Sequence, residues 1–149
     1  MEVIPEKSIY RYLGNSGLWV SVLSYGNYLT ANTEEEEKTS IECIKKAYEL
    51  GVNFFDTAEI YGYGRAEEVL GKALKEIGMR REDIVISTKL LSVGSGVHDK
   101  GLSRKHIIEG LRNSLKRLQL DYVDIVFAHW PDVETPLEET CKAFSWCID

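Results

Sequence analysis

Short apolar runs alternate with amphipathic segments along the chain. The runs have the length of buried strands and cover residues 20–23, 52–55, 83–89 and 122–128. Each is followed by a segment in which apolar residues recur every three or four positions, over residues 33–50, 66–77, 103–118 and 135–149. That spacing is typical of a helix with one buried face. Strand-like runs that alternate with such helices predict a parallel sheet covered by helices.

A β-hairpin is predicted ahead of these units. Ile9–Leu13 and Leu18–Val20 are rich in apolar and aromatic residues, and they flank the turn-forming segment Gly14–Gly17. We expect Val20–Leu23 to form the first parallel strand and Ser24–Asn27 to form the loop that follows it.

Capping residues mark the starts of several predicted helices. Thr33 and Glu36 have the spacing of a capping box, in which each side chain bonds the other residue's backbone N–H. Ser103 can cap the third helix. Thr135–Glu138 has the same capping-box spacing, and it places Pro136 at the first helical position.

This order of elements can form either a doubly wound open sheet or a (β/α)₈ barrel. The dinucleotide-binding sequence G-x-G-x-x-G is absent between the first strand and the first helix, which argues against the open sheet. The phosphate-binding sequence G-x-x-x-x-G-K-S/T is also absent. The pattern therefore favours an α/β fold of the (β/α)₈ TIM-barrel family. The chain would supply its N-terminal hairpin and roughly the first four βα units.

The length predicts that such a barrel is incomplete. A whole barrel needs about 250 residues, whereas this chain has 149. We therefore interpret residues 1–149 as a single, incomplete domain. Unpaired strand edges and an uncovered inner face predict that the isolated chain is not a stable monomer. We expect a homo-oligomer or association with a complementary half-barrel.

Composition narrows the possible partners. Hydrophobic residues make up 44% and charged residues 28% of the chain, as in ordinary soluble domains. A net charge of −6 argues against nucleic acid or an anionic membrane as partner. We find no membrane-spanning run and no opening targeting signal, so a cytoplasmic location is expected. Cys43, Cys141 and Cys147 show no metal-site spacing and are interpreted as reduced core thiols.

Three predicted strands end in reactive polar residues. Asp56, Lys89 and His129 hold these positions, and Tyr61 lies in the loop after Asp56. Each also has an ordinary structural explanation, as a turn acid, a salt-bridge partner, a turn histidine or a half-buried aromatic. In a barrel, however, the carboxyl ends of the strands converge on one face, so these side chains can meet.

Together the four side chains are suited to protonating a carbonyl oxygen while a hydride reaches its carbon. Tyrosine is a poor acid at neutral pH, because its unperturbed pKa is about 10. A nearby ammonium such as that of Lys89 favours the phenolate, and a carboxylate such as that of Asp56 keeps the lysine charged and in place. An imidazole at His129 can orient the substrate oxygen.

These residues carry a resemblance to the aldo-keto reductase superfamily. The segment Asp56–Gly62 reads Asp-Thr-Ala-Glu-Ile-Tyr-Gly and matches the family signature Asp-Thr-Ala-x-x-Tyr-Gly, and Lys89 and His129 match its strand-terminal lysine and histidine. Within the superfamily, the chain is most similar to the β subunits of voltage-gated potassium channels and their plant and microbial relatives. The stretches that carry this likeness are Tyr12–Leu18, Arg65–Gly71, Gly101–Leu111 and Tyr122–Ala128.

The resemblance implies an NADP(H)-binding barrel and a role for each site residue. Tyr61 would be the general acid, Lys89 and Asp56 would tune it, and His129 would orient the carbonyl near the nicotinamide. The segment Gly26, Asn27 and Tyr28 matches the first cofactor-contacting loop of the family, and Asp56 and His129 would also border the cofactor. The choice of NADP over NAD follows from the resemblance alone.

Three functions follow as alternatives. The first is an NADPH-dependent reductase, or its N-terminal half, that converts small aldehydes or ketones to alcohols. The second is a regulatory subunit that binds NADP(H) and docks on a membrane channel α subunit. The third is a truncated half-barrel without activity. Vertebrate channel β subunits carry Asn where this chain has His129, which favours the first alternative over the second.

Overall fold

The computed structural model describes residues 9–28 and 33–148. The elements run in the order β1 (Tyr10–Tyr12), β2 (Trp19–Ser21), β3 (Tyr25–Gly26), α1 (Glu34–Glu49), β4 (Phe54–Asp56), η1 (Tyr61–Gly64), α2 (Arg65–Ile77), η2 (Arg81–Asp83), β5 (Val85–Leu90), α3 (Arg104–Leu118), β6 (Ile125–Ala128) and α4 (Leu137–Ile148). Residues 1–8, where no targeting signal was expected, lie outside the described part of the chain.

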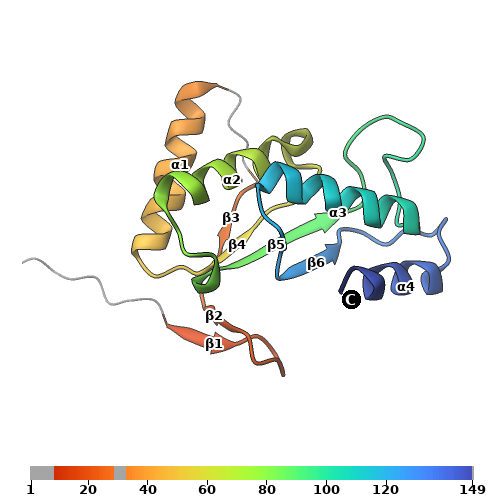
Figure 1. Ribbon diagram of the computed structural model, residues 1–149, viewed down its shortest axis with the longest axis horizontal. Helices are drawn as coiled ribbons and strands as arrows, with labels where there is room; N and C mark the ends of the chain where they lie inside the picture. Colours follow the sequence, from red (N-terminus) through yellow and green to blue (C-terminus); the bar gives the residue numbers. More distant parts are fainter. Residues whose placement is uncertain (1–8, 29–32, 149) are drawn as a thin grey trace, which may run out of the picture.

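A parallel sheet in the order β3-β4-β5-β6 forms the centre of the structure. Helices α1, α2 and α3 lie over one of its faces, and the antiparallel β1–β2 hairpin lies beyond one end (Figure 1). Neighbours in sequence are neighbours in the sheet, as in the wall of a barrel. The predicted parallel α/β arrangement is therefore confirmed.

The main core fills the space between this sheet and the helices. Phe55 of β4 and Ile86 of β5 are fully buried against apolar side chains of the covering helices, including Ile44, Leu70 and Leu118. The predicted Thr33–Glu36 capping box is present at the start of α1, and Ser103 Oγ accepts the His106 N–H at the start of α3. Within the described ranges, no helix is both long and apolar enough to span a membrane.

The prediction for the first parallel strand is wrong. Trp19–Ser21 is the second strand of the hairpin, Val22 and Leu23 are exposed, and the parallel strand is Tyr25–Gly26. Val20 and Ser21 belong to the hairpin because they pair with Arg11 and Tyr10 of β1. The Ser21 N–H donates to Asn53 Oδ1 at 2.7 Å and the Asn53 N–H donates to Ser21 Oγ at 3.1 Å, which ties the hairpin to the segment before β4. A two-residue strand has no periodicity to detect.

The start of the last helix also differs from the prediction. Helix α4 begins at Leu137, so Pro136 precedes the helix. The hydroxyl of Thr135 donates to Asp132 Oδ2 at 2.6 Å, and Asp132 also accepts the N–H groups of Leu102 and Glu134. These hydrogen bonds lower the pKa of Asp132 to about 2. Asp132 therefore organises the turn after β6 and ties it to the loop before α3.

The cysteines are free thiols, and two of them are not core residues. Cys43 in α1 and Cys141 in α4 are exposed, whereas Cys147 in α4 is partly buried and packs against the core cluster that contains Ala143. The core prediction is wrong for Cys43 and Cys141, because these positions lie beside the buried stripes of their helices, which run through residues such as Ile44 and Ala143.

Candidate active site

The predicted reactive residues meet at the carboxyl end of the sheet. Asp56 is the last residue of β4, Lys89 lies one residue before the end of β5, and His129 directly follows β6. The strands' register sets Asp56 beside Ser87, two residues before Lys89, and the His129 N–H donates to Leu90 O at 3.0 Å. An open hollow of about 410 Å³ lies here, lined by Ser24, Gly26, Phe54, Asp56, Lys89, Phe127, Ala128 and His129.

Lys89 forms hydrogen bonds with two of the other predicted reactive residues, Asp56 and Tyr61. Its ammonium donates to Asp56 Oδ2, to the carbonyl oxygen of Thr57 at 2.7 Å and to the phenol oxygen of Tyr61 at 3.2 Å. The other carboxylate oxygen of Asp56 accepts the Ser87 hydroxyl at 2.6 Å. These charge-assisted hydrogen bonds hold the ammonium in place and direct it at the phenol.

Tyr61 reaches this position from a 3₁₀ turn, although the sequence predicted a plain loop. Its N–H donates to Ala58 O at 3.1 Å, and Gly62 and Tyr63 both have positive φ angles, of 57° and 54°. That conformation is unfavourable for Tyr63, which has a Cβ. The turn leads directly into α2, and Tyr61 contacts Lys89 and His129, two residues that line the hollow, without lining it itself.

His129 packs edge-on against Tyr61, with ring centroids 5.6 Å apart and an interplanar angle of 77°. Burial lowers the pKa of His129, and the positive charge of Lys89 lowers it further, against the opposing effects of Asp56 and Glu59. The imidazole is therefore neutral at pH 7. A neutral imidazole carries one N–H donor and one acceptor, which suits it to bind a carbonyl oxygen.

The three residues of the predicted cofactor segment, Gly26, Asn27 and Tyr28, have different surroundings. Gly26 belongs to β3 and lines the hollow, while Tyr28 is 67% exposed and packs edge-on against Tyr61 at 5.0 Å. Asn27 is buried; its backbone N–H donates to Asp56 O and its side-chain amide donates to Ala66 O at 2.7 Å. Asn27 thus joins the end of β3 to the start of α2. Its role toward a cofactor stays a prediction.

The walls of the hollow are both apolar and polar. Its walls combine apolar faces from Phe54 and Phe127 with polar groups from Asp56, Lys89 and His129. Such a mixture, in a volume of a few hundred Å³, is typical of small-molecule sites.

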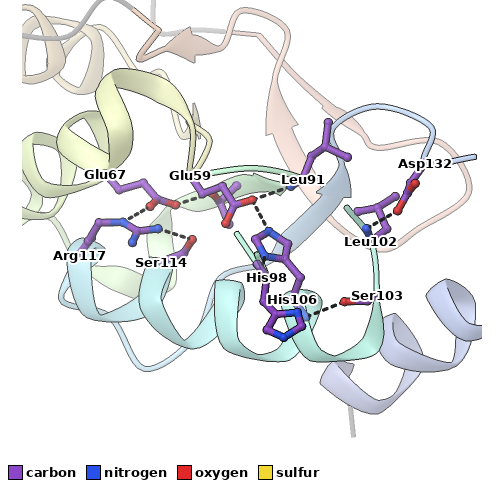
Figure 2. A network of polar contacts seen from close by, with 11 residues as sticks. Glu59, Glu67, Leu91, His98, Leu102, Ser103, His106, Ser114, Arg117 and Asp132 are labelled. Carbon is purple, nitrogen blue, oxygen red and sulfur yellow. Dashed lines mark hydrogen bonds and ion pairs between the residues drawn. The ribbon is translucent and has the colours of Figure 1, made fainter. Parts of the chain in front are cut away.

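A buried polar network behind the site was not predicted. Glu59 and Glu67 are both fully buried, and they contact His106 and Arg117 of α3, respectively (Figure 2). Sequence reasoning missed them because charged residues in helices and loops are normally solvated. The available signals were the places of Glu59 inside the segment Asp56–Gly62 and of Glu67 inside the stretch Arg65–Gly71.

The sequence matches a known protein family and curated relatives. The sequence model described as the Aldo/keto reductase family matches residues 22–149. A "Probable voltage-gated potassium channel subunit beta" of Oryza sativa subsp. japonica is 54% identical over 140 residues, and a protein of the same description from Arabidopsis thaliana is 52% identical. Each alignment covers 94% of this chain and 43% of the relative. The chain therefore spans less than half the length of these curated relatives.

Solved structures show the same likeness. A thermostable aldo-keto reductase in complex with the inhibitor epalrestat matches with a TM-score of 0.81 and 36% identity, over 94% of this chain and 49% of that chain. The holo form of an aldo-keto reductase from Bacillus halodurans matches with a TM-score of 0.81 and 34% identity, over 93% of this chain and 46% of that chain.

Proposed function

Because this chain belongs to the aldo/keto reductase family, we propose that it is the N-terminal half of an NADPH-dependent reductase that converts aldehydes or ketones to alcohols. The observation that carries the proposal is the set of contacts around Lys89: its ammonium bonds both Asp56 and the Tyr61 phenol, and the ring of His129 packs against that phenol. A cytoplasmic location belongs to the same proposal.

Each of the four side chains has its own role in proton transfer. NADPH, when bound, supplies the hydride. Tyr61 gives its phenol proton to the carbonyl oxygen of the substrate, and the Lys89 ammonium stabilises the phenolate that remains. Asp56 keeps the lysine charged and directed at Tyr61. Neutral His129 donates an N–H to the same carbonyl oxygen, and the phenol then regains a proton from solvent.

Gly26, Asn27, Tyr28, Asp56 and His129 are the residues we assign to holding NADP(H) in this half. Gly26 leaves space for a close approach, because a Cβ added at this position would meet no atom within 4 Å. The exposed ring of Tyr28 offers an apolar surface beside Tyr61. The preference for NADP rests on the family resemblance.

A regulatory role is the second candidate. The rice and Arabidopsis relatives favour it, since each is described as a probable voltage-gated potassium channel subunit beta. In that case the chain would bind NADP(H) and dock on a channel α subunit. A half-barrel that neither binds cofactor nor turns over substrate is the third candidate.

Two measurements separate these candidates: NADPH titration followed by fluorescence, and turnover of a nitrobenzaldehyde. For a reductase we expect binding and turnover, and we expect Tyr61→Phe to lower kcat by roughly 10²–10⁴-fold, the usual contribution of a general acid. Tyr63→Phe is the matched control, because Tyr63 lies two residues away, is 83% exposed and should leave kcat unchanged.

The other outcomes point to the alternatives. Binding without turnover supports the regulatory role, and no binding supports the inactive half-barrel. Full turnover in Tyr61→Phe would show that Tyr61 is not the proton donor.

A further inference from the structure

Glu59 joins the loop that carries Tyr61 to the end of β5 that carries Lys89. Its backbone N–H donates to Lys89 O at 3.1 Å, and its carboxylate Oε1 accepts the Leu91 N–H at 2.6 Å. The two bonds bracket Leu90, a fully buried residue. Glu59 therefore holds the backbone on both sides of the strand end from which the Lys89 side chain projects.

His106 holds the Glu59 carboxylate from the other side. This imidazole is 4% exposed, and its Nε2 lies 2.9 Å from Glu59 Oε1 while its Nδ1 lies 2.9 Å from the carbonyl oxygen of His98 (Figure 2). Because a carbonyl oxygen can only accept, Nδ1 carries a hydrogen, and a second hydrogen on Nε2 makes the ring a cation paired with Glu59. Burial opposes this charge, but the hydrogen bond and the charge of Glu59 prevail and raise the pKa of His106.

Burying the Glu59 carboxylate costs free energy. A fully buried carboxylate loses its hydration, and ion pairing often does no more than offset that loss. Within the described residues, Glu59 Oε2 has no hydrogen-bond partner. Helix α3 comes close enough to enclose it because residue 110 is glycine: a Cβ there would lie 3.0 Å from Oε2.

The Lys89 side chain is a second attachment of the 57–61 loop, and it belongs to the reactive group itself. The Lys89 ammonium bonds Thr57 O and the Tyr61 phenol, on either side of Glu59 in sequence. Without the Glu59 carboxylate, the 57–61 loop would lose its bonds to the Leu91 N–H and to His106 of α3, and the Lys89 ammonium would be its remaining side-chain link to β5. The distance between the Lys89 ammonium and the Tyr61 phenol, which is 3.2 Å, would then no longer be maintained by the bonds of Glu59.

We propose that Glu59 and His106 are positioning residues that hold the Tyr61 loop against the end of β5, so that the Lys89 ammonium stays within hydrogen-bond distance of the Tyr61 phenol. The inference rests on the proposed reductase function for its kinetic consequence, but not for its geometric one. Neither residue touches the substrate or the cofactor in this assignment.

A matched control is available in the same network. Glu67 is also a fully buried carboxylate; it accepts the Thr88 hydroxyl at 2.6 Å and the Arg117 Nε–H at 2.7 Å. It lies in α2, outside the 57–61 loop. Removing it should therefore destabilise the fold comparably without moving Tyr61 relative to Lys89.

The test compares Glu59→Leu, Glu59→Gln and Glu67→Leu in the full chain. Glu59→Leu should lower kcat by about 10- to 100-fold, with an unchanged Kd for NADPH, because a misplacement of about 1 Å can cost that much. Glu59→Gln should recover most of kcat, since an amide oxygen in the place of Oε1 still accepts the Leu91 N–H and can accept an N–H from His106 Nε2. Glu67→Leu should leave kcat within about twofold of the wild type.

Crystal structures of the same variants give a readout that needs no activity. In Glu59→Leu the separation of Lys89 Nζ and Tyr61 Oη should exceed hydrogen-bond distance, and in Glu67→Leu it should not. A wild-type chain without turnover would refute the proposed function, and this separation would still decide the positioning role. An unchanged separation in Glu59→Leu, or an equal loss of kcat in Glu67→Leu, would overturn the proposal.

If Glu59→Leu does not fold, His106→Gln carries the test. It leaves the carboxylate and its bond to Leu91 and removes the imidazole. A lengthened separation of Lys89 Nζ and Tyr61 Oη supports the proposal, and an unaltered one refutes it.

Discussion

Charged neighbours shift the pKa values of two histidines in this structure. Lys89 and His129 lie close enough that the ammonium lowers the pKa of the imidazole, whereas Glu59 raises the pKa of His106 on the far side of the loop. Two histidines of one chain are therefore shifted in opposite directions. The pKa of His129, which lines the hollow, is lowered, and the pKa of His106, which is buried beside the Glu59 carboxylate, is raised.

Histidine titration by NMR should show this difference directly. The chain has three histidines, so assignment by single substitution is practical. We expect the ring of His129 to titrate below pH 6.5 and that of His106 above it, the value for a free histidine being about 6.5. Lys89→Met should raise the pKa of His129, because it removes a neighbouring positive charge. A pKa of His129 that does not respond to this substitution would contradict the assigned electrostatics.

The raised pKa of His106 also makes stability depend on pH. Because the folded pKa lies above the unfolded value of about 6.5, the pair's contribution is fully present below pH 6.5 and is lost as the pH rises through the folded pKa. The difference in unfolding free energy between the wild type and His106→Gln should therefore be larger at pH 5.5 than at pH 9. Urea unfolding at both values measures it, and a difference that grows with pH would contradict the ion pair.

The elements pack closely because small residues stand at their contacts. Helices α2 and α3 meet at Gly71, where an added Cβ would lie 2.4 Å from the backbone oxygen of Leu118. Helix α2 also ends at Gly78, whose φ of 70° suits glycine. The sequence signalled the end of the helix, because glycine after an apolar stripe is a recognised stop. It did not signal the role of Gly71, because close approach depends on a partner 47 positions away.

Gly71→Ala should therefore destabilise the fold. Alanine favours a helix over glycine by about 1 kcal/mol, but the backbone oxygen of Leu118 can move away only if α3 shifts. We expect a net loss of about 1–3 kcal/mol in unfolding free energy, as for other overpacked contacts. Gly17→Ala is the control, because a Cβ at that position would meet no atom within 4 Å. Equal stability of the two variants would show that α2 and α3 tolerate separation.

The molecule as a whole presents an open inner face. Helices cover the side of the sheet that carries Phe55 and Ile86, whereas Phe127 on the other side is 44% exposed. In the described part of the chain, β3 and β6 each pair with a strand on one side only. Unpaired edges and exposed apolar surface both promote association.

We therefore expect the 149-residue chain, studied by itself, to associate. Sedimentation velocity should show species heavier than one chain, and Phe127→Glu should weaken their formation by placing a charge on the open face. Val133→Glu is the control, because Val133 is 95% exposed and lies in the turn after β6 rather than in the sheet. A well-folded monomer that does not associate would refute the expectation.

The order of the elements, the fold class and the residues at the strand ends follow from local patterns in the sequence. Apolar runs, helical stripes and caps are local, so Thr33, Ser103 and the ends of β4 and β6 could be recognised from a few neighbours each. The folded chain alone shows which run joins the hairpin, how Lys89 reaches Tyr61, and that Glu59 and His106 lie buried together. Those outcomes depend on contacts between residues tens of positions apart, and a charged side chain can be buried only when a distant partner meets it.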